Sequence, residues 1–393
     1  MRPVKRCANL EMDGEIEVAI ITNIPTPYRR EQWECYAKLQ NVKMTVYYCA
    51  HTEKGRFWKF EPASNVQEKF LKGIDLGKGL HFNPGILSVV RKDVDIFMVG
   101  GYGYPTLIIA IILLKILRKP YIMLIDGVSP LTNANPERGF IFKAKKFLID
   151  GAFAYFANGS ISKFYLRKLG VPEWKIFNQY LTVNVSYFID KMDEANFNRN
   201  KFRSELGIDK NTIVVLYCGR VVKNKGIQDL HIAVDKCRKN GYNVVALIVG
   251  EGPFRRKLEK QPSLYSGNAI FMGYVPDSEL YMYYYASDIF VFPTHYDPWG
   301  LVVNEAMACG LPVIVSDAAG CHFDLVRNGR NGFVVHAGDV NGIVRAIELL
   351  SNSDLRKHFG EESLRIISRW TYKESTSEFQ RLIKTFKHTI RSQ

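Results

Sequence analysis

The sequence predicts an α/β fold built from two consecutive Rossmann-like domains, and three observations support this prediction. Short, continuously apolar runs alternate with helical stretches along most of the chain, a pattern typical of parallel sheets that helices cover on both faces. The length of 393 residues suits two domains of ordinary size. The composition, 47% apolar and 23% charged, is that of a chain able to bury a core.

The first domain is expected over residues 1–190. Strands are predicted at 17–22, 42–49, 96–100 and 121–125, and helices at 28–39 and 107–117. The strand segments are apolar with little polar alternation, so both faces of the sheet should be buried. A polar, charged stretch at 190–209 then predicts a linker.

The second domain is expected over residues 191–371, with a new series of strand and helix signals. Strands are predicted at 213–217, 244–249, 269–271, 289–292, 312–315 and 332–335. A last amphipathic helix is predicted over 372–393.

The charge and the cysteines narrow the class of protein. The net charge is +14, and most of the excess lies in the first 190 residues. Such a charge attracts a nucleic acid, an anionic membrane or a phosphorylated substrate, and composition alone does not choose among these. The seven cysteines form no C-x-x-C motif, and the first residues lack the apolar segment of a signal peptide. A cytoplasmic protein with free thiols and no zinc site is therefore expected.

A basic loop follows the predicted strand at 213–217 and precedes a helix. It contains Gly219, Arg220, Lys225 and Gly226. Loops that lead from a strand to a helix N-terminus bind phosphate in α/β sheets, and the two cations suit a diphosphate. The alternative is a solvated connecting loop.

A glycine turn formed by Gly250, Glu251 and Gly252 follows the strand at 244–249. It is not a dinucleotide fingerprint, because Arg255 occupies the position of the third glycine. It predicts either part of a binding edge or a tight turn without a ligand.

The third motif runs from residue 293 into a helix that begins near residue 301. Asp297 lies in the loop and Glu305 lies within the helix. A loop carboxylate can accept hydrogen bonds from sugar hydroxyls, and a carboxylate inside a helix can hold a ribose diol. The backbone amides of Gly300, Leu301 and Val302 can face an anion. A capped surface helix is the alternative, but Glu305 would then place an unpaired charge on an apolar face.

Together and in this order, the three motifs resemble the C-terminal half of glycosyltransferase family 4, and in particular bacterial members that assemble polysaccharide and lipopolysaccharide. The family pairs a G-R-x(n)-K-G loop with an E-x7-E element, which stands here as DPWGLVVNEAMACG. Asp297 replaces the first Glu of that element, and Trp299 replaces the usual Phe. The resemblance implies a retaining enzyme with the GT-B fold, in which two Rossmann-like domains face each other across a cleft. It also implies that the last helix packs back on the first domain.

The resemblance assigns roles to the motif residues. Arg220 and Lys225 would hold the donor diphosphate, Glu305 the ribose, and Asp297 the donor sugar. Backbone atoms of segment 271–276 would read the nucleobase. The remaining donor-binding residues would be Gly219, Gly250, Glu251, Gly252, Tyr274, Val275, Trp299, Gly300, Leu301 and Val302. The donor would be a UDP- or GDP-linked sugar, and neither a metal nor another cofactor is expected.

The first domain carries weaker signals for the acceptor side. Tyr28 and Arg29 end an I-P-x-P-Y-R segment that resembles a variant found in polysaccharide-assembling members, and both would point toward the cleft. Asp126 would lie near the anomeric carbon and steady positive charge there, unless Asp126 and the glycine after it form a plain turn. Gly101 and Tyr102 follow another strand and would shape the acceptor cleft.

Residues 138–168 combine basic and aromatic side chains. Such a segment can lie on an anionic membrane, bind nucleic acid, or form an ordinary helix pair with basic outer faces. With the enzyme interpretation, a membrane surface that carries a lipid-linked acceptor is favoured, and no nucleic acid is expected.

The sequence thus predicts a retaining glycosyltransferase that acts in polysaccharide or glycoconjugate synthesis. It would transfer a sugar from a nucleotide diphosphate to a glycan or lipid-linked acceptor. Two alternatives stay open: a nucleotide-sugar epimerase, and a catalytically weak protein that only binds the nucleotide sugar.

Overall fold

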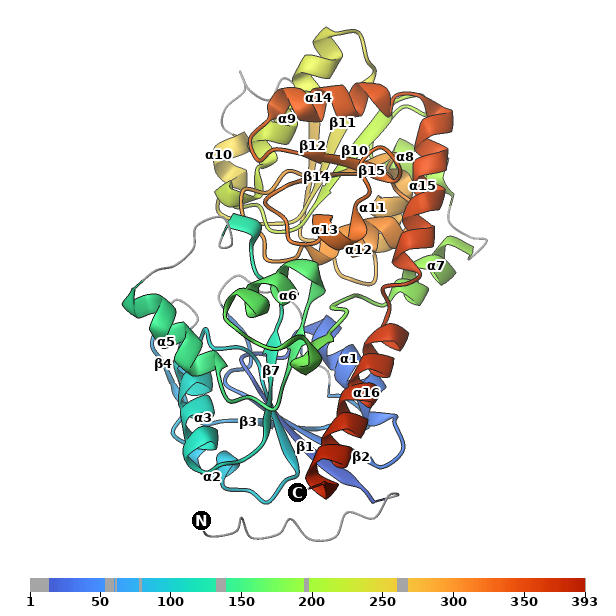
Figure 1. Cartoon of the computed structure of the whole chain (residues 1–393). Coiled ribbons are helices and arrows are strands. Elements are labelled where there is room, and N and C mark those ends of the chain that lie inside the picture. Colours follow the sequence, from blue (N-terminus) through green and yellow to red (C-terminus); the bar gives the residue numbers. More distant parts are fainter. Residues whose placement is uncertain are drawn as a thin grey trace.

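The chain folds into two α/β lobes connected by two crossing segments (Figure 1). The computed structural model describes residues 14–53, 60, 62–77, 80–131, 139–193, 198–259 and 268–392. Each lobe contains a parallel sheet covered by helices, as the apolar strand segments predicted.

The first lobe is built on a seven-stranded parallel sheet in the order β3-β2-β1-β6-β7-β8-β9. Its strands are β1 (Ile16–Thr22), β2 (Val42–Tyr48), β3 (Gln67–Phe70), β6 (Ile96–Val99), β7 (Tyr121–Ile125), β8 (Ala154–Ala157) and β9 (Ile176–Asn178). The strand order reverses between β1 and β6, which places a topological switch point at their carboxyl ends.

Helices cover both faces of this sheet. One face packs against α2 (Ile86–Val90), α3 (Pro105–Ile116), α5 (Phe140–Ile149) and α6 (Gly159–Lys168). The other face packs against α1 (Pro27–Ala37) and α16 (Tyr372–Arg391). A short hairpin, β4 (Ile74–Asp75) and β5 (His81–Phe82), and the 3-10 turn Glu173–Lys175 complete the lobe. The helix predicted at 107–117 is α3, and none of the described helices is long and apolar enough to cross a membrane.

The second lobe repeats this architecture with a six-stranded sheet in the order β12-β11-β10-β13-β14-β15. Its strands are β10 (Ile213–Cys218), β11 (Val244–Val249), β12 (Ala269–Gly273), β13 (Ile289–Phe292), β14 (Val313–Ser316) and β15 (Gly332–Val335). Its helices are α8 (Arg199–Glu205), α9 (Ile227–Lys239), α10 (Arg255–Glu259), α11 (Leu280–Ala286), α12 (Leu301–Ala308), α13 (His322–Leu325), α14 (Val340–Leu349) and α15 (Ser353–Ile367). The strand order reverses between β10 and β13.

The chain crosses between the lobes earlier than the boundary expected at residue 190. Helix α7 (Val185–Asp193) buries Val185 and Phe188 in the core of the second lobe. Leu181 and Val183 belong to the same core, so the crossing lies near residue 180. The described residues of the polar stretch at 190–209 belong mostly to α7 and α8 of the second lobe, so this stretch lies beyond the crossing and does not mark the boundary.

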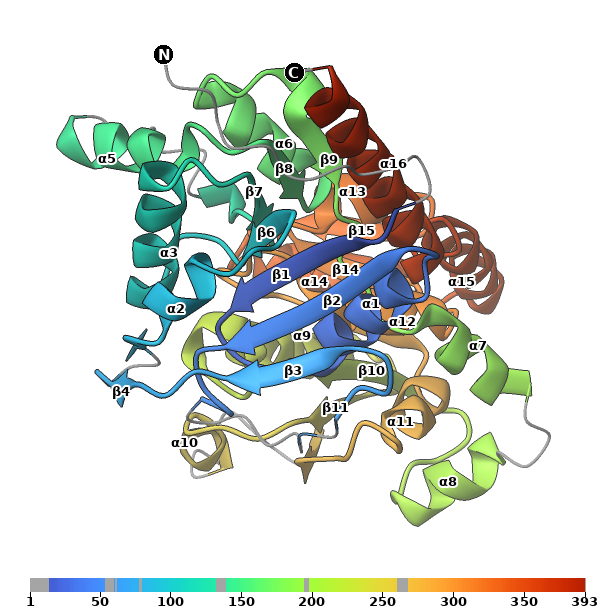
Figure 2. The same cartoon turned by 90° about the horizontal axis from the view of Figure 1, so that it is seen from below.

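Helix α16 returns to the first lobe, where it lies beside α1 (Figure 2). Phe379 stacks on the ring of Tyr36 with centroids 4.3 Å apart. The Ser375 and Tyr36 hydroxyls are 2.6 Å apart, and the Gln32 amide donates to Ser375 at 2.6 Å. A capping box of Thr371 and Glu374 begins the helix. The last twenty or so residues are therefore part of the first lobe's core.

Candidate functional site

The loops that follow β10 and β13 meet at the topological switch point of the second lobe. The His295 amide donates to the carbonyl of Asn224 at 2.8 Å. Gly226 has a φ of +68°, and a Cβ at this position would lie 1.9 Å from the carbonyl oxygen of Pro293. Only glycine permits this approach. The sequence motifs around 219–226 and 293–300 thus form one surface.

The glycine turn after β11 packs against the basic loop that follows β10. The Val221 amide donates to the carbonyl of Glu251 at 2.9 Å. A Cβ on Gly250 would lie 1.9 Å from the oxygen of Gly219, and one on Gly252 would lie 2.3 Å from the oxygen of Val221. These glycines let the two loops pack backbone against backbone. The Glu251 carboxylate pairs with Arg255 at 2.8 Å, so it is engaged within its own turn.

The two loops present an ion pair at their junction. The Lys225 ammonium contacts one carboxylate oxygen of Asp297, and the other oxygen accepts from the Trp299 amide at 2.9 Å. Lys225 also lies 5.4 Å from the centre of the Phe292 ring. The loop carboxylate is therefore fixed by a cation and by a backbone donor.

Arg220 lies exposed at the edge of the same surface. Within the described ranges, its guanidinium has no hydrogen-bond or ion-pair partner, whereas its carbonyl accepts from the Tyr217 hydroxyl at 2.8 Å. The loop after β10 therefore carries one cation without a partner among the described residues and one paired cation.

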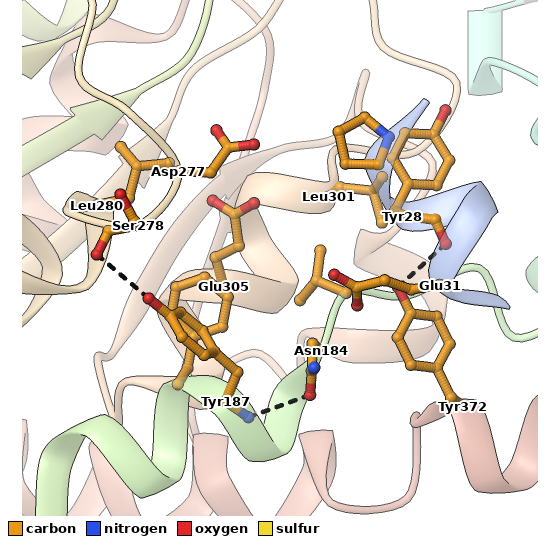
Figure 3. A pocket seen from close by; sticks show the side chains of 13 residues that line it. Tyr28, Glu31, Asn184, Tyr187, Asp277, Ser278, Leu280, Leu301, Glu305 and Tyr372 are labelled. Atoms are coloured by element: carbon orange, nitrogen blue, oxygen red, sulfur yellow. Dashed lines mark hydrogen bonds between the residues drawn. The ribbon is translucent and has the colours of Figure 1, made fainter. Parts of the chain in front are cut away.

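A cavity of about 400 Å³ opens between the lobes beside α12. Glu305 reaches into it from the second lobe (Figure 3). The Tyr284 hydroxyl donates to its carboxylate at 2.6 Å, and burial raises the pKa of Glu305 to about 7. The cavity is lined, besides Glu305, by Pro27, Tyr28, Glu31, Val183, Asn184, Tyr187, Phe188, Asp277, Ser278, Leu280, Leu301 and Tyr372.

Two further carboxylates face this cavity and were missed by sequence reasoning. Glu31 comes from α1 of the first lobe, and Asp277 lies at the exposed rim (Figure 3). Desolvation raises the pKa of both groups, and the charge of Asp277 adds to the increase at Glu31 and Glu305. Glu31 stands three residues after Tyr28, so helical spacing was the available signal. A largely apolar cavity with convergent polar groups is typical of a small-molecule site.

The structure places Tyr28 and Arg29 differently from one another. Tyr28 lines the cavity. The Arg29 side chain is only 5% exposed: it forms an ion pair with Asp126 and lies over the Trp33 ring at 5.3 Å. Arg29 is thus not a free cation facing the cleft, because Asp126, far along the chain, neutralises it.

The turn that contains Asp126 touches the second lobe. The Asp126 side chain remains 52% exposed. A Cβ on Gly127 would lie 2.6 Å from the carbonyl oxygen of Pro298, next to Asp297 in the chain. The structure therefore brings the turn of Asp126, which was predicted to lie near the anomeric carbon, against the loop that contains Asp297. Gly101 follows β6 and has a φ of +80°. The hydroxyl of the next residue, Tyr102, lies 3.0 Å from the hydroxyl of Tyr165.

Trp299 is part of the connection between lobes and does not line the cavity. Its ring is 3% exposed and stacks on Trp370 with centroids 5.1 Å apart. Its Nε1 donates to the Asn304 side chain at 3.1 Å. The Trp370 indole in turn donates to the carbonyl of Leu181 at 2.9 Å. Trp299 thus fixes the loop of residues 293–300 against both crossing segments.

The other predicted donor residues lie around the same loops. Leu301 lines the cavity, and Val302 is partly buried beside it. Gly300 has a φ of +102°, and a Cβ there would lie 2.7 Å from the Phe292 ring. Tyr274 is 48% exposed and Val275 is 7% exposed after β12. Among the described residues, no group of three or more His, Cys, Asp or Glu side chains forms a metal site.

Comparisons with known proteins match the second lobe in sequence. Residues 198–365 match the family model of glycosyl transferases group 1. A capsular polysaccharide biosynthesis glycosyltransferase of Staphylococcus aureus is 32% identical over 178 residues, which is 44% of this chain and 46% of that protein. A lipopolysaccharide core biosynthesis glycosyltransferase of Rhizobium meliloti is 32% identical over 162 residues, or 40% and 46% of the two chains. The matched part thus spans about half the length of these relatives.

Solved structures match both lobes. HepE of Anabaena in complex with UDP aligns with 94% of this chain and 100% of its own, with a TM-score of 0.75 and 18% identity. The sucrose-phosphate synthase of Thermosynechococcus elongatus covers 95% of this chain, with a TM-score of 0.72 and 18% identity. The fold of this chain is therefore the GT-B fold, as the sequence motifs predicted.

Proposed function

We propose that this chain is a retaining glycosyltransferase of family 4 that transfers a sugar from a UDP- or GDP-linked donor to a glycan or lipid-linked acceptor. One observation carries the proposal: the cationic loop of Arg220 and Lys225 pairs through Lys225 with Asp297, and the loop of Asp297 leads into α12, whose Leu301 and Glu305 line the cavity. A nucleotide diphosphate has the same layout, with a dianionic part joined to a ribose and a base.

The diphosphate would lie against Arg220, Lys225 and the start of α12. Arg220 can bind two oxygens as a fork, and Lys225 acts as a point charge. The amides of Gly300, Leu301 and Val302 begin α12 and add the favourable end of its dipole. Two side-chain cations and a helix start would stabilise the leaving group without a metal ion.

The ribose would lie in the cavity with its diol on Glu305. The Tyr284 hydroxyl holds this carboxylate in place. Two ribose hydroxyls donating to Glu305 would replace the hydration that burial removes from it. The base would then extend toward Tyr274 and Val275 at the carboxyl end of β12.

The donor sugar would lie between Asp297 and the turn of Asp126. The acceptor hydroxyl attacks the anomeric carbon from the face of the leaving group. The bond from its oxygen to C1 forms as the bond from C1 to the phosphate oxygen breaks, and the departing phosphate takes the hydroxyl proton. Asp126 would steady the positive charge that develops on the sugar ring. This route conserves the anomeric configuration and needs no side chain as the base.

The names of two relatives support the proposed acceptor class. These two assemble capsule and lipopolysaccharide core in bacteria. A growing glycan or a lipid-linked sugar is the acceptor that both chemistries share, which supports the same class here.

A thermal-shift panel of UDP, GDP, ADP and their sugars tests the proposal. Binding to the folded chain raises its melting temperature by mass action. We expect a shift with UDP or GDP that Arg220→Ala removes. No shift with any nucleotide would overturn the proposal, and epimerised donor formed without an acceptor would make the chain an epimerase instead.

A further inference from the structure

Helix α5 of the first lobe exposes an apolar stripe to solvent. Phe140 is 84% exposed, Ile141 is 61% exposed and Phe147 is 60% exposed. The opposite side of the helix supplies the contacts with the lobe, because Ile149 is fully buried and Phe142 packs against the core. The apolar stripe is therefore the side of α5 that points away from the core of the lobe.

The end of α3 extends this surface. Ile116 is 70% exposed and Leu117 is 42% exposed. Lys115, the residue before them, lies over the Phe147 ring at 4.3 Å and donates to the Phe147 carbonyl. The two helix ends thus adjoin, and we name Ile116, Leu117, Phe140, Ile141 and Phe147 the α5 face.

Basic residues surround the α5 face. Helix α5 contains Lys143, Lys145 and Lys146 and no acidic residue. The end of α3 and the residues after it add Lys115, Arg118 and Lys119, again with no acidic residue among 115–119. The nearest carboxylate on α5's own segment is Asp150, which pairs with Lys146 at 3.2 Å. The surface is therefore apolar in its centre and positive around it.

An apolar centre with a basic surround suits an anionic lipid bilayer. Exposed large apolar groups gain free energy by entering the acyl boundary, and the lysines gain by approaching lipid phosphates. A nucleic acid would meet the same charges, but Ile116, Leu117 and Ile141 have no aromatic face on which bases stack. The composition of the α5 face thus favours lipid.

We propose that the α5 face docks the first lobe on an anionic membrane surface. The inference that this surface binds a membrane rests only on the exposed apolar and basic side chains described above. Its use, which rests on the proposed function, is to hold the acceptor-side lobe where a lipid-linked acceptor resides. The second lobe would remain in water to exchange nucleotides.

Flotation with lipid vesicles tests this proposal. The full chain should float with vesicles of phosphatidylcholine containing 30% phosphatidylglycerol and not with pure phosphatidylcholine, and about 0.5 M salt should weaken the binding. Substituting Phe140→Ser, Ile141→Ser and Phe147→Ser together should lower the binding at least tenfold, since three exposed apolar side chains are lost. Lys143→Glu alone should also lower the binding to the anionic vesicles, because it reverses one charge beside the α5 face.

Leu349→Ser and Met192→Ser provide the matched control, because both side chains are exposed on the second lobe. The control should float as the unchanged chain does. Equal flotation of the triple variant, or equal binding to neutral and anionic vesicles, would overturn the proposal. A dimer that the triple substitution splits would identify the α5 face as a protein interface instead. The nucleotide thermal shift of each variant shows that it is folded and tests the proposed function separately.

Discussion

Lys225 and Asp297 neutralise each other across the two loops that follow β10 and β13. Both side chains are partly buried, at 18% and 16% exposure, and their loops are joined by backbone hydrogen bonds. A diphosphate that approaches Lys225 must therefore compete with, or share, a carboxylate already in place. The ion pair holds the Lys225 ammonium and the Asp297 carboxylate, which we propose contacts the donor sugar, at fixed positions.

Asp297→Asn should separate nucleotide binding from sugar transfer. Removing the carboxylate charge frees Lys225, so affinity for UDP or GDP should stay the same or improve a few-fold. Sugar transfer should fall by about tenfold or more, because a hydrogen bond from the sugar to a charged acceptor is lost. Calorimetry and a transfer assay measure the two effects. Asp317→Asn, at the exposed pair with His336, serves as the control. Loss of nucleotide affinity in Asp297→Asn would contradict this role.

Arg220→Ala should weaken binding of the nucleotide diphosphate about 10- to 100-fold, the usual effect of losing charge-assisted hydrogen bonds of about 1.5–3 kcal/mol. Stability should change little, since the guanidinium has no partner in the described part of the chain. Lys223→Ala, an exposed basic residue three positions along the same loop, is the matched comparison. Equal losses in the two variants would mean that only the net charge of the loop matters.

Binding of the donor sugar nucleotide should depend on pH through Glu305. Burial raises its pKa to about 7 in the free chain, so the neutral form prevails below that pH. Ribose hydroxyls donate to the ionised form, so binding must release the proton. Affinity should therefore rise with pH up to about 7 and then level, with up to about a tenfold loss for each unit below. The sugar nucleotide is the probe of choice, because its phosphates carry no proton that titrates near neutral pH.

Glu305→Gln should remove this pH dependence and weaken binding at pH 8. Calorimetry between pH 5.5 and 8 measures both. A slope retained in the glutamine variant would assign the proton to another group, with Asp277 and Glu31 as the nearest cavity carboxylates whose pKa is also raised.

Gly226→Ala should destabilise the second lobe more than a strained backbone alone explains. Gly226 and Gly329 have similar φ values, +68° and +74°. A Cβ on Gly226 would lie 1.9 Å from a carbonyl oxygen, whereas one on Gly329 meets nothing within 4 Å. Denaturant unfolding should show a loss of about 1 kcal/mol for Gly329→Ala and at least about 2–3 kcal/mol for Gly226→Ala. Equal losses would mean that the two loops are free to move apart.

The fold could be predicted from sequence where strands are long and apolar. The runs at 42–49 and 244–249 became β2 and β11, but β3, β8 and β9 were missed. β8 and β9 have only four and three residues, and β3 is an edge strand with polar side chains. These segments are strands because they pair with neighbouring strands of the sheet, and their own sequences contain no pattern that predicts this pairing.

The candidate site could likewise be predicted only in part from the sequence. Local motifs led to Arg220 and Glu305, since each stands in a loop or helix whose neighbours carry the pattern. Asp277 carries no such pattern, and Glu31 carries only its helical spacing from Tyr28, because it is the meeting of the two lobes that brings both carboxylates to one cavity. The pairing of Arg29 with Asp126 was likewise invisible, since 97 residues separate them in the chain.

The return of α16 to the first lobe has a consequence for synthesis on the ribosome. Phe379, Leu382, Ile383 and Phe386 fill a core whose other members begin at Ile16. The emerging first lobe must therefore wait, with one face of its sheet covered only in part by α1, until α16 (residues 372–391) has been translated. The second lobe is continuous and can close its sheet first, which inverts the usual order in which the N-terminal domain folds before the next. During that interval the partly covered face, rich in apolar side chains, is a natural place for a chaperone to bind.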